Sequence, residues 1–208
     1  YDIGELGRDI VGLIDHFGKD NVLLVGHDWG AAVAWWTAIQ HSDRIKKLAI
    51  LNVPHPVVMR ENLFNNWSQV KRSWYIFFFQ LPWMPEWFMS HNDFATAIKS
   101  ISAKYELTST DIERYKEAWG RTRAVKSMIN WYRAAFRSLK KAKGKGNVTV
   151  PTLMLWGKLD TALGSEMAQP SIDLCENGKL IFFEDATHWV QHEKAEDVNK
   201  HLLEFFLE

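Results

Sequence analysis

One short segment, Leu23–Trp36, constrains the fold of this 208-residue chain more than any other. Its sequence, LLVGHDWGAAVAWW, runs from an apolar strand into a glycine-flanked turn and then into small residues suited to a helix. A buried strand that passes into a helix through such a turn is typical of parallel α/β sheets. Functional groups gather beyond the carboxyl ends of the strands in these sheets, so we expect the turn to lie at a functional edge.

The same alternation of strand and helix recurs at both ends of the chain. Continuous apolar runs predict buried parallel strands at residues 21–25, 47–51, 152–156 and 180–183. Apolar residues at helical spacing predict helices at residues 3–17, 30–39 and 194–207. We therefore expect an α/β fold with a parallel sheet that is covered by helices on both faces.

The middle of the chain has a different character, with no convincing strand between residues 57 and 147. Helical spacing predicts helices there at residues 65–80, 93–103, 110–119 and 123–140. Thr110 and Glu113 are spaced to cap the third of these helices. We expect residues 1–56 and 148–208 to form the α/β core, and residues 57–147 to form an all-helical cap domain inserted between two of its strands.

Composition excludes several classes of function. The 25 Lys and Arg residues balance the 25 Asp and Glu residues, so neither nucleic acid nor an acidic membrane is an expected partner. The single cysteine, Cys175, excludes an internal disulfide and argues against a thiolate metal cluster. No apolar run reaches the roughly 20 residues that span a bilayer, so we expect no membrane segment. The expectation is a cytoplasmic protein without a metal ion or an organic cofactor.

The turn places an aspartate, Asp28, at the position that a nucleophilic serine takes in many hydrolases. Serine needs a base to become a nucleophile, whereas a carboxyl group with an ordinary pKa of about 3.9 is already ionised at neutral pH. Carboxylate attack on an ester gives a labile anhydride, but attack on an sp³ carbon gives a stable alkyl ester. Aspartate here therefore favours alkyl transfer, from an epoxide or from a carbon–halogen bond. The alternative is a loop aspartate with no chemical role.

Cleavage of such an ester needs a base and a group that orients the base. His188 follows the last predicted strand and is the expected base, while Asp160 follows the preceding strand and is the expected orienting acid. His192 is expected at the surface, and Asp185 precedes His188 so closely that a loop cap is the better interpretation. The order nucleophile, acid, histidine is that of the α/β-hydrolase fold.

Epoxide opening and dehalogenation differ in the leaving group. A halide leaves without a proton, whereas the alkoxide from an epoxide needs a donor, and a phenol with a pKa of about 10 suits that task. Tyr75 and Tyr132, both in the predicted cap, are the candidate donors. Tyr105 and Tyr115 have flanking residues more typical of packing or surface positions.

Five motifs together resemble the soluble epoxide hydrolase family of the α/β-hydrolase fold, along nearly the whole chain. They are GHDWG, WYIFFFQLP, INWYR, WGKLD and DATHWVQHEK. The resemblance implies that Asp28 is the nucleophile and that Asp160 and His188 form the charge-relay pair. It also implies that Tyr75 and Tyr132 polarise the epoxide oxygen.

The GHDWG motif by itself is less specific, because haloalkane dehalogenases share it and use the tryptophan after the aspartate to hold the halide. Trp29 is the candidate for holding a halide, with Trp74 or Trp131 as a second N–H donor. The same three tryptophans are candidates for substrate binding. The two tyrosines favour the epoxide, and haloalkane dehalogenase is the alternative.

Members of the resembled family carry several strands and a His-Gly-x-Pro loop before the segment that corresponds to residues 3–17, and this sequence matches neither. We therefore expect a partial sheet that lacks the amino-terminal strands and whose first strand has an unpaired apolar edge. Without that loop, ester hydrolysis should suffer more than alkylation, since one oxyanion donor is worth about 10²–10³ in rate. A catalytically impaired fragment that acts as an interaction module is a third hypothesis.

The resulting prediction is an enzyme that converts a small epoxide and water into a vicinal diol through an alkyl ester on Asp28. A homodimer is compatible with the resemblance. His27 is expected to pack beneath the turn, and Asn52 and His55 are expected near the hinge of the cap.

Overall fold

The computed structural model describes residues 1–102, 107–138 and 146–208, and it divides into two compact units. The sheet unit comprises residues 2–73 and 142–208, and the helical unit comprises residue 1 and residues 74–141. Residues 57–73, which the sequence analysis assigns to the cap, group with the sheet unit. The last residues of the predicted helices 93–103 and 123–140 lie outside the described part of the chain.

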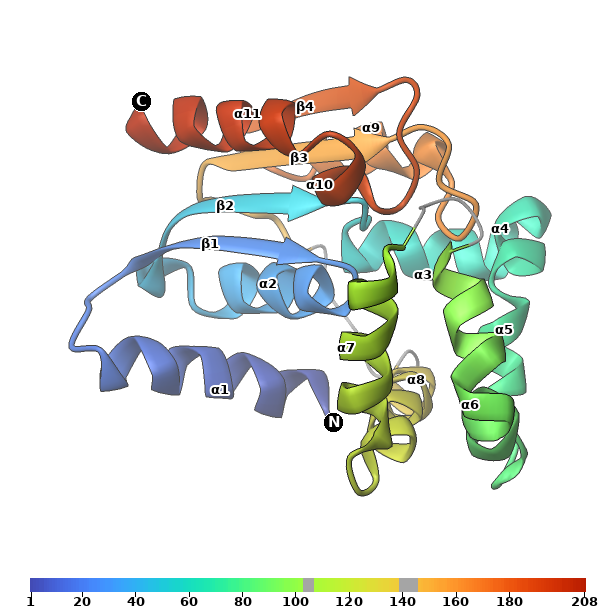
Figure 1. Cartoon of the computed structure of the whole chain (residues 1–208). Helices are drawn as coiled ribbons and strands as arrows, with labels where there is room; N and C mark the ends of the chain where they lie inside the picture. The colour runs from blue at the N-terminus through green and yellow to red at the C-terminus, as the bar shows by residue number, and fades with distance from the viewer. Residues whose placement is uncertain (103–106, 139–145) are drawn as a thin grey trace. The chain divides into compact units, whose positions relative to one another are not determined.

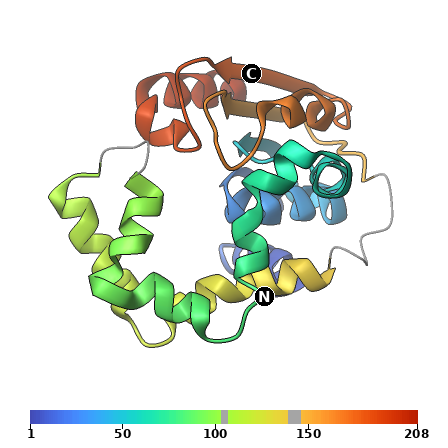
Figure 2. The same cartoon turned by 90° about the vertical axis from the view of Figure 1, so that its right-hand side faces the viewer.

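Four parallel strands form the sheet, in the order β1, β2, β3, β4 (Figure 1). Their bounds are β1 Val22–His27, β2 Ile45–Leu51, β3 Thr152–Gly157 and β4 Gly178–Phe183. Each apolar run singled out in the sequence is therefore a strand, and the predicted parallel α/β sheet is confirmed. Figure 2 views the same sheet from the side to which its strands point.

Helices lie on both faces of this sheet. The α-helices of the sheet unit are α1 (Ile3–His16), α2 (Trp29–Gln40), α3 (Pro56–Asn65), α4 (Trp67–Arg72), α9 (Ala168–Ile172), α10 (Val190–Glu193) and α11 (Ala195–Leu207). Two short 3₁₀ turns, η1 (Ser42–Arg44) and η2 (Ser165–Met167), precede β2 and α9. The predicted helices near both chain ends are confirmed, with boundaries shifted by one residue at most.

Alternate residues of each strand enter two different cores, because successive side chains of a strand point to opposite faces. Leu48 and Ile50 of β2 belong to a core that includes side chains of α1, α2, α3 and α9. Ala49 and Leu51 belong to a second core with side chains of α10 and α11. Since burying one large apolar side chain stabilises a fold by about 1.5–3 kcal/mol, these two cores hold the strand ends firmly in place.

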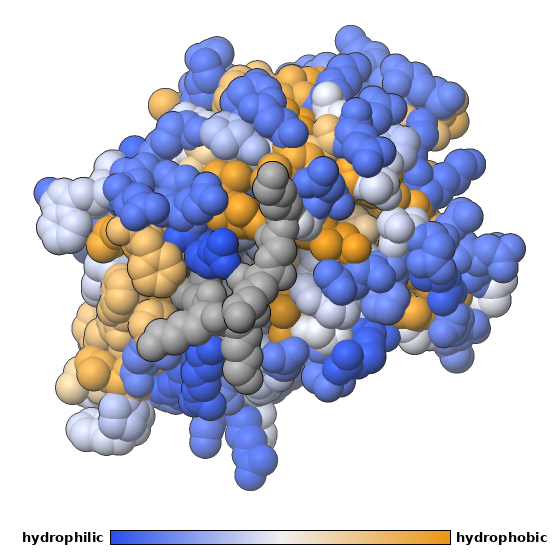
Figure 3. All heavy atoms as spheres, turned by 180° about the vertical axis from the view of Figure 1, so that it is seen from behind, coloured by the Kyte–Doolittle hydropathy of each residue, from blue (hydrophilic) through white to orange (hydrophobic). Residues whose placement is uncertain are grey.

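β1 is the edge strand of the described sheet and pairs with β2. Leu23 and Val25 stand in register with Lys47 and Ala49, so they point to the face that carries α10 and α11, yet they are 44% and 45% exposed. The apolar edge expected from the sequence is therefore present in the described structure. Elsewhere, on the side drawn in Figure 3, apolar patches interrupt a mostly hydrophilic surface.

The helical unit contains α5 (Trp74–Phe78), α6 (Met84–Ser102), α7 (Ser109–Gly120) and α8 (Ala124–Ser138). α6 is interrupted at His91–Phe94, where the backbone leaves helical geometry. The expected cap at Thr110 and Glu113 is wrong by two residues, since Thr108 and Asp111 form the reciprocal capping box of α7. Both pairs have the required spacing, but only Thr108 lies outside the helix.

Arg133 of α8 ties the helical unit together. Its guanidinium pairs with Glu86 at 2.5 Å and donates to the backbone carbonyls of Phe79 and Leu81 at 3.0 and 2.6 Å. These charge-assisted hydrogen bonds join α8 to the segment after α5. Within the described residues, no helix is long and apolar enough to cross a membrane.

Candidate active site

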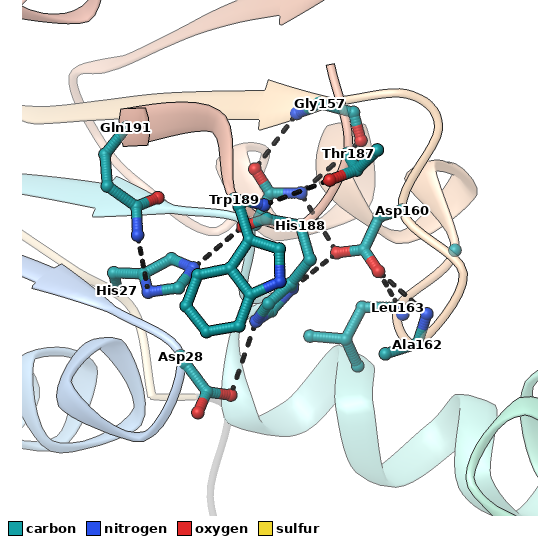
Figure 4. A network of polar contacts seen from close by, with 12 residues as sticks. His27, Asp28, Gly157, Asp160, Ala162, Leu163, Thr187, His188, Trp189 and Gln191 are labelled. Atoms are coloured by element: carbon teal, nitrogen blue, oxygen red, sulfur yellow. Dashed lines mark hydrogen bonds and ion pairs between the residues drawn. The ribbon is translucent and has the colours of Figure 1, made fainter. Parts of the chain in front are cut away.

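The parallel strands β1, β3 and β4 deliver the polar groups of the candidate site to one edge of the sheet. Asp28 directly follows β1, Asp160 lies shortly after β3, and His188 lies shortly after β4. Figure 4 shows these three side chains converging in one network of polar contacts. The sequence-predicted nucleophile, acid and base are therefore brought together within the sheet unit.

The turn between β1 and α2 holds Asp28 in a strained backbone conformation, with φ 50° and ψ −129°. A positive φ is uncommon for a residue with a side chain, costs about 1–3 kcal/mol, and persists only where the surroundings enforce it. Gly26 lets those surroundings close in, because a Cβ at this position would lie 2.6 Å from the Ala31 Cα atom. The glycines were expected to permit the turn, but Asp28 itself adopts the unusual angle.

The amino terminus of α2 points its first N–H groups toward the same place. The Asp28 carbonyl accepts from Ala31 and Ala32, and the Trp29 N–H donates to the Asp28 carboxylate. Orphan N–H groups at a helix start favour negative charge. Trp29 therefore contributes through its backbone, at the first residue of the helix.

Asp160 is a buried carboxylate whose two oxygens are both occupied. Oδ1 accepts from the backbone N–H groups of Ala162 and Leu163, at 2.8 and 2.9 Å. Oδ2 lies 2.7 Å from His188 Nδ1 and accepts from the Asn52 side chain at 3.0 Å. A carboxylate with this many donors is well compensated for its burial, and it orients the imidazole through Nδ1.

The other ring nitrogen of His188 faces the candidate nucleophile. Nε2 lies 3.6 Å from Asp28 Oδ1, which makes an ion pair when the imidazole is protonated. Burial alone would lower the pKa of His188, but the hydrogen bonds and charges of Asp160 and Asp28 outweigh it and raise the pKa to about 10. Burial opposes ionisation of Asp28, yet His188 and the Trp29 N–H lower the pKa of Asp28 overall. The resting site is therefore a cation between two anions.

His27 forms a hydrogen bond with the backbone of His188, the candidate base. Its Nε2 lies 2.8 Å from the His188 carbonyl, which can only accept, and its Nδ1 lies 3.2 Å from the Gln191 amide nitrogen, which can only donate. These partners define a neutral tautomer with the proton on Nε2. Burial and the charge of His188 lower the pKa of His27 to about 4, so it stays neutral beside the ion pair.

The loop that carries His188 packs directly on the end of β3. A Cβ on Gly157 would lie 2.2 Å from the Thr187 carbonyl oxygen, so only glycine allows this approach. Glu193 accepts from the backbone N–H and the hydroxyl of Thr187, at 2.5 and 2.6 Å. Asp185 pairs with Lys194 at 2.6 Å, and His192 is exposed, so neither competes for the roles expected of Asp160 and His188.

The remaining candidates lie in the helical unit. Tyr75 of α5 and Tyr132 of α8 have ring centroids 5.7 Å apart at nearly a right angle, and Phe79 contacts both rings. Trp74 is 63% exposed at the start of α5, and Trp131 of α8 lies beside Tyr1. The two phenols are therefore neighbours, while the two tryptophans have different surroundings.

The alternative tyrosines have no comparable arrangement. Tyr115 stacks on Trp119 in α7, as expected of a packing residue, and Tyr105 lies outside the described residues. No group of His, Cys, Asp and Glu side chains that could hold a metal ion occurs among the residues described.

Asn52 is the member of the site that sequence reasoning missed. It was expected near a hinge, but it is fully buried and bonded to Asp160. One signal could have found it, since it is the first residue after the predicted strand 47–51 and so lies at the functional edge of a parallel sheet. His55, expected in the same region, accepts from the Val57 N–H at the start of α3.

Known proteins with similar sequences and structures provide a comparison for this chain. The sequence profile of the alpha/beta hydrolase fold matches residues 1–195. The AB hydrolase superfamily protein YfhM of Bacillus subtilis is 41% identical over 208 residues, which cover 99% of this chain and 72% of that protein. Epoxide hydrolase 1 of Caenorhabditis elegans is 36% identical, over 99% of this chain and 52% of its own length.

A crystal structure of an epoxide hydrolase from Bacillus megaterium is similar in three dimensions. It matches this chain with a TM-score of 0.90 at 27% sequence identity, over 100% of this chain and 77% of the other. The chain thus spans about half the length of the C. elegans protein and about three quarters of the two Bacillus proteins.

Gly26→Ala should destabilise the sheet unit, whereas Gly30→Ala should not. The new Cβ at position 26 meets backbone atoms of Gly30 and Ala31 that cannot move aside, and such overpacking costs about 1–3 kcal/mol. A Cβ at position 30 has no atom within 4 Å, and alanine in a helix gains about 0.5–1 kcal/mol over glycine. Urea denaturation of the two variants measures the difference, and equal free energies of unfolding would contradict the close approach at Gly26.

Asp28→Asn should lower the pKa of His188 below the value of about 10 in the wild type. The substitution removes a negative charge and a hydrogen-bond acceptor that favour the protonated imidazole. NMR titration of the His188 ring measures the pKa directly. Asp185→Asn is the matched control, because that carboxylate faces Lys194 and should leave His188 unchanged. A titration that is the same in all three proteins would contradict the ion pair.

Proposed function

The chain belongs to the alpha/beta hydrolase fold family, as its motifs predict, and from this premise we propose that it is an epoxide hydrolase acting through Asp28. The observation that carries the proposal is the Asp28 carboxyl group at the turn after β1, 3.6 Å from His188, which is in turn bonded to Asp160 at 2.7 Å. Relatives named epoxide hydrolase support the substrate class.

In the first step, an Asp28 oxygen attacks one epoxide carbon and the bond from that carbon to the epoxide oxygen breaks. Tyr75 and Tyr132 donate to the departing oxygen, and one of them gives it a proton. The product is a hydroxyalkyl ester of Asp28. The nucleophile needs no base, because the pKa of Asp28 is already lowered in the resting site.

In the second step, His188 removes a proton from water, and the hydroxide attacks the ester carbonyl of Asp28. The Trp29 N–H, which already binds the Asp28 carboxylate, stabilises the oxyanion. Collapse of this intermediate releases the vicinal diol and restores the carboxylate. Epoxide and water are the only reactants consumed, and no metal ion or organic cofactor takes part.

His188 changes from cation to base between these steps. Asp28 supplies part of the hydrogen bonding and charge that raise the pKa of His188 to about 10. Esterification cancels that charge, so the pKa of His188 falls in the intermediate and the ring gives up its proton, which passes through water to the phenolate left by the first step. The neutral ring can then accept a proton from water. Formation of the ester thus prepares the base that cleaves it.

The helical unit favours substrates with hydrocarbon groups. An open groove of about 480 Å³ is lined by Phe78, Trp83, Met84, Trp87 and Phe88. Phe78 also contacts Phe79, whose ring centroid is 4.8 Å from that of Tyr132. An aromatic or aliphatic epoxide has the apolar surface that such a lining binds best.

His188→Gln should trap the covalent intermediate. Without its base, the protein should form the ester and fail to cleave it, so intact-protein mass spectrometry after exposure to styrene oxide should show an adduct of the whole epoxide on Asp28. The double variant with Asp28→Asn is the control and should show none. A parallel exposure to a bromoalkane tests the dehalogenase alternative, which predicts an alkyl adduct from the bromide and none from the epoxide, whereas the proposal requires the epoxide adduct and allows both. Absence of both adducts would contradict the proposal.

Tyr75→Phe and Tyr132→Phe should each slow the formation of the epoxide adduct by about 10²-fold, the usual contribution of a general acid. Alkylation by a bromoalkane should be nearly unaffected, since bromide leaves without a proton. Tyr115→Phe is the matched control, because its ring packs on Trp119. The time course of the adduct mass gives each rate, and equal effects on both reagents would argue against proton donation.

A further inference from the structure

Asn52 is a buried amide at the carboxyl end of β2, and the proposed mechanism does not yet use it. Its backbone has φ 52°, a region that asparagine tolerates better than most residues. Its own N–H donates to the Leu155 carbonyl of β3 at 3.0 Å. This conformation ends the β2 strand and sends the side chain across the end of β3.

The chemistry of its partners fixes which way the amide is turned. The Gly157 N–H can only donate, so the side-chain atom 3.0 Å from it is Asn52 Oδ1. Nδ2 therefore faces Asp160 Oδ2 at 3.0 Å, and the Gly157 carbonyl at 3.4 Å. A fully buried side chain with its donor and acceptor atoms both matched has one orientation only.

Asn52 holds the oxygen of Asp160 that matters for the relay. Oδ1 of Asp160 is bound by two backbone N–H groups of its own loop, whereas Oδ2 is the atom 2.7 Å from His188 Nδ1. The Asn52 amide is the side-chain donor that fixes Oδ2 against the end of β2. Without the Asn52 amide, Asp160 Oδ2 would keep His188 Nδ1 as a partner but would lose the hydrogen bond that fixes its position.

We propose that Asn52 is a positioning residue for the ester-cleaving step. It keeps Asp160 Oδ2 aligned with His188 Nδ1, and thereby keeps His188 Nε2 directed toward Asp28. The kinetic part of this inference rests on the proposed function, but the alignment of the relay itself does not. Alkylation of Asp28 does not use His188 as a base and should not depend on Asn52.

Two substitutions separate positioning of the relay from a simple tie between strands. Asn52→Leu is close in size and removes both the donor and the acceptor. Asn52→Asp keeps an acceptor for Gly157 but sets a carboxyl group against Asp160, and two carboxyl groups this close share one proton. When that proton is present the carboxyl donates as the amide does, so the variant should weaken as pH rises. Thr37→Val is the matched control, since Thr37 is equally buried but bonds only within α2.

The rates of ester formation and ester decay with styrene oxide, followed by rapid-quench mass spectrometry, test the kinetic part. Asn52→Leu should form the ester at nearly the wild-type rate and cleave it about tenfold more slowly, the loss expected for one hydrogen bond to a charged group. Asn52→Asp should cleave it normally near pH 6 and progressively more slowly toward pH 9. Thr37→Val should match the wild type in both steps. Wild-type ester decay in Asn52→Leu, or an Asn52→Asp profile parallel to the wild type, would overturn the inference.

The proton NMR signal of His188 Nδ1–H tests the alignment without any substrate. Asn52→Leu should move this downfield signal and speed its exchange with solvent, while Thr37→Val leaves both unchanged. If the wild type forms no ester but this signal responds as described, the proposed function fails and the positioning role stands. If the signal and its exchange rate are the same in all three proteins, the positioning role fails whatever the reaction proves to be.

Discussion

The ion cluster of Asp160, His188 and Asp28, in which Asp160 is buried and Asp28 is half exposed, is the interaction around which the candidate site is built. The imidazole of His188 lies between two carboxylates, 2.7 Å from one and 3.6 Å from the other, and their hydrogen bonds and charges raise its pKa to about 10. Desolvation of such charges is costly unless every oxygen and N–H finds a partner. Asp160 meets that condition with donors on both oxygens, whereas the half-exposed Asp28 combines solvent with His188 and the start of α2. The cluster therefore persists in the sheet unit as a cation held by two anions.

Close packing of the backbone makes this cluster possible. Gly26 and Gly157 each stand where a Cβ would overlap neighbouring main-chain atoms, one between β1 and α2 and the other between β3 and the His188 loop. The first approach closes the turn that carries Asp28, and the second brings the His188 loop, which is distant in the chain, against the end of β3. The strained backbone of Asp28 is stabilised in a similar way. β1 precedes it and α2 follows it, and both elements pack in the core that contains Leu48 and Ile50.

Much of this could be read from the sequence, because long apolar runs have few alternatives to buried parallel strands. The strand ends then placed Asp28, Asp160 and His188 at one edge without any structural information. Other features depend on geometry that a linear pattern does not contain. Asn52 looks like an ordinary turn residue until its amide is found against Asp160, and the neutral state of His27 follows from two partners more than 160 residues away. The capping box of α7 was misplaced because two pairs with equivalent spacing lie within a few residues of each other.

In the proposed reaction, an aspartate nucleophile and a histidine with a raised pKa depend on each other. A serine nucleophile would require His188 to be neutral at the start, since the hydroxyl must give up its proton before it attacks. Asp28 needs no such help, so His188 is free to rest as a cation with its pKa raised to about 10 by the two carboxylates. That cation in turn keeps Asp28 ionised and ready to attack. In the proposed reaction the ester removes one of the two anions, and the histidine becomes a base only when there is an ester to cleave. In that proposal, the charge on Asp28 times the second step.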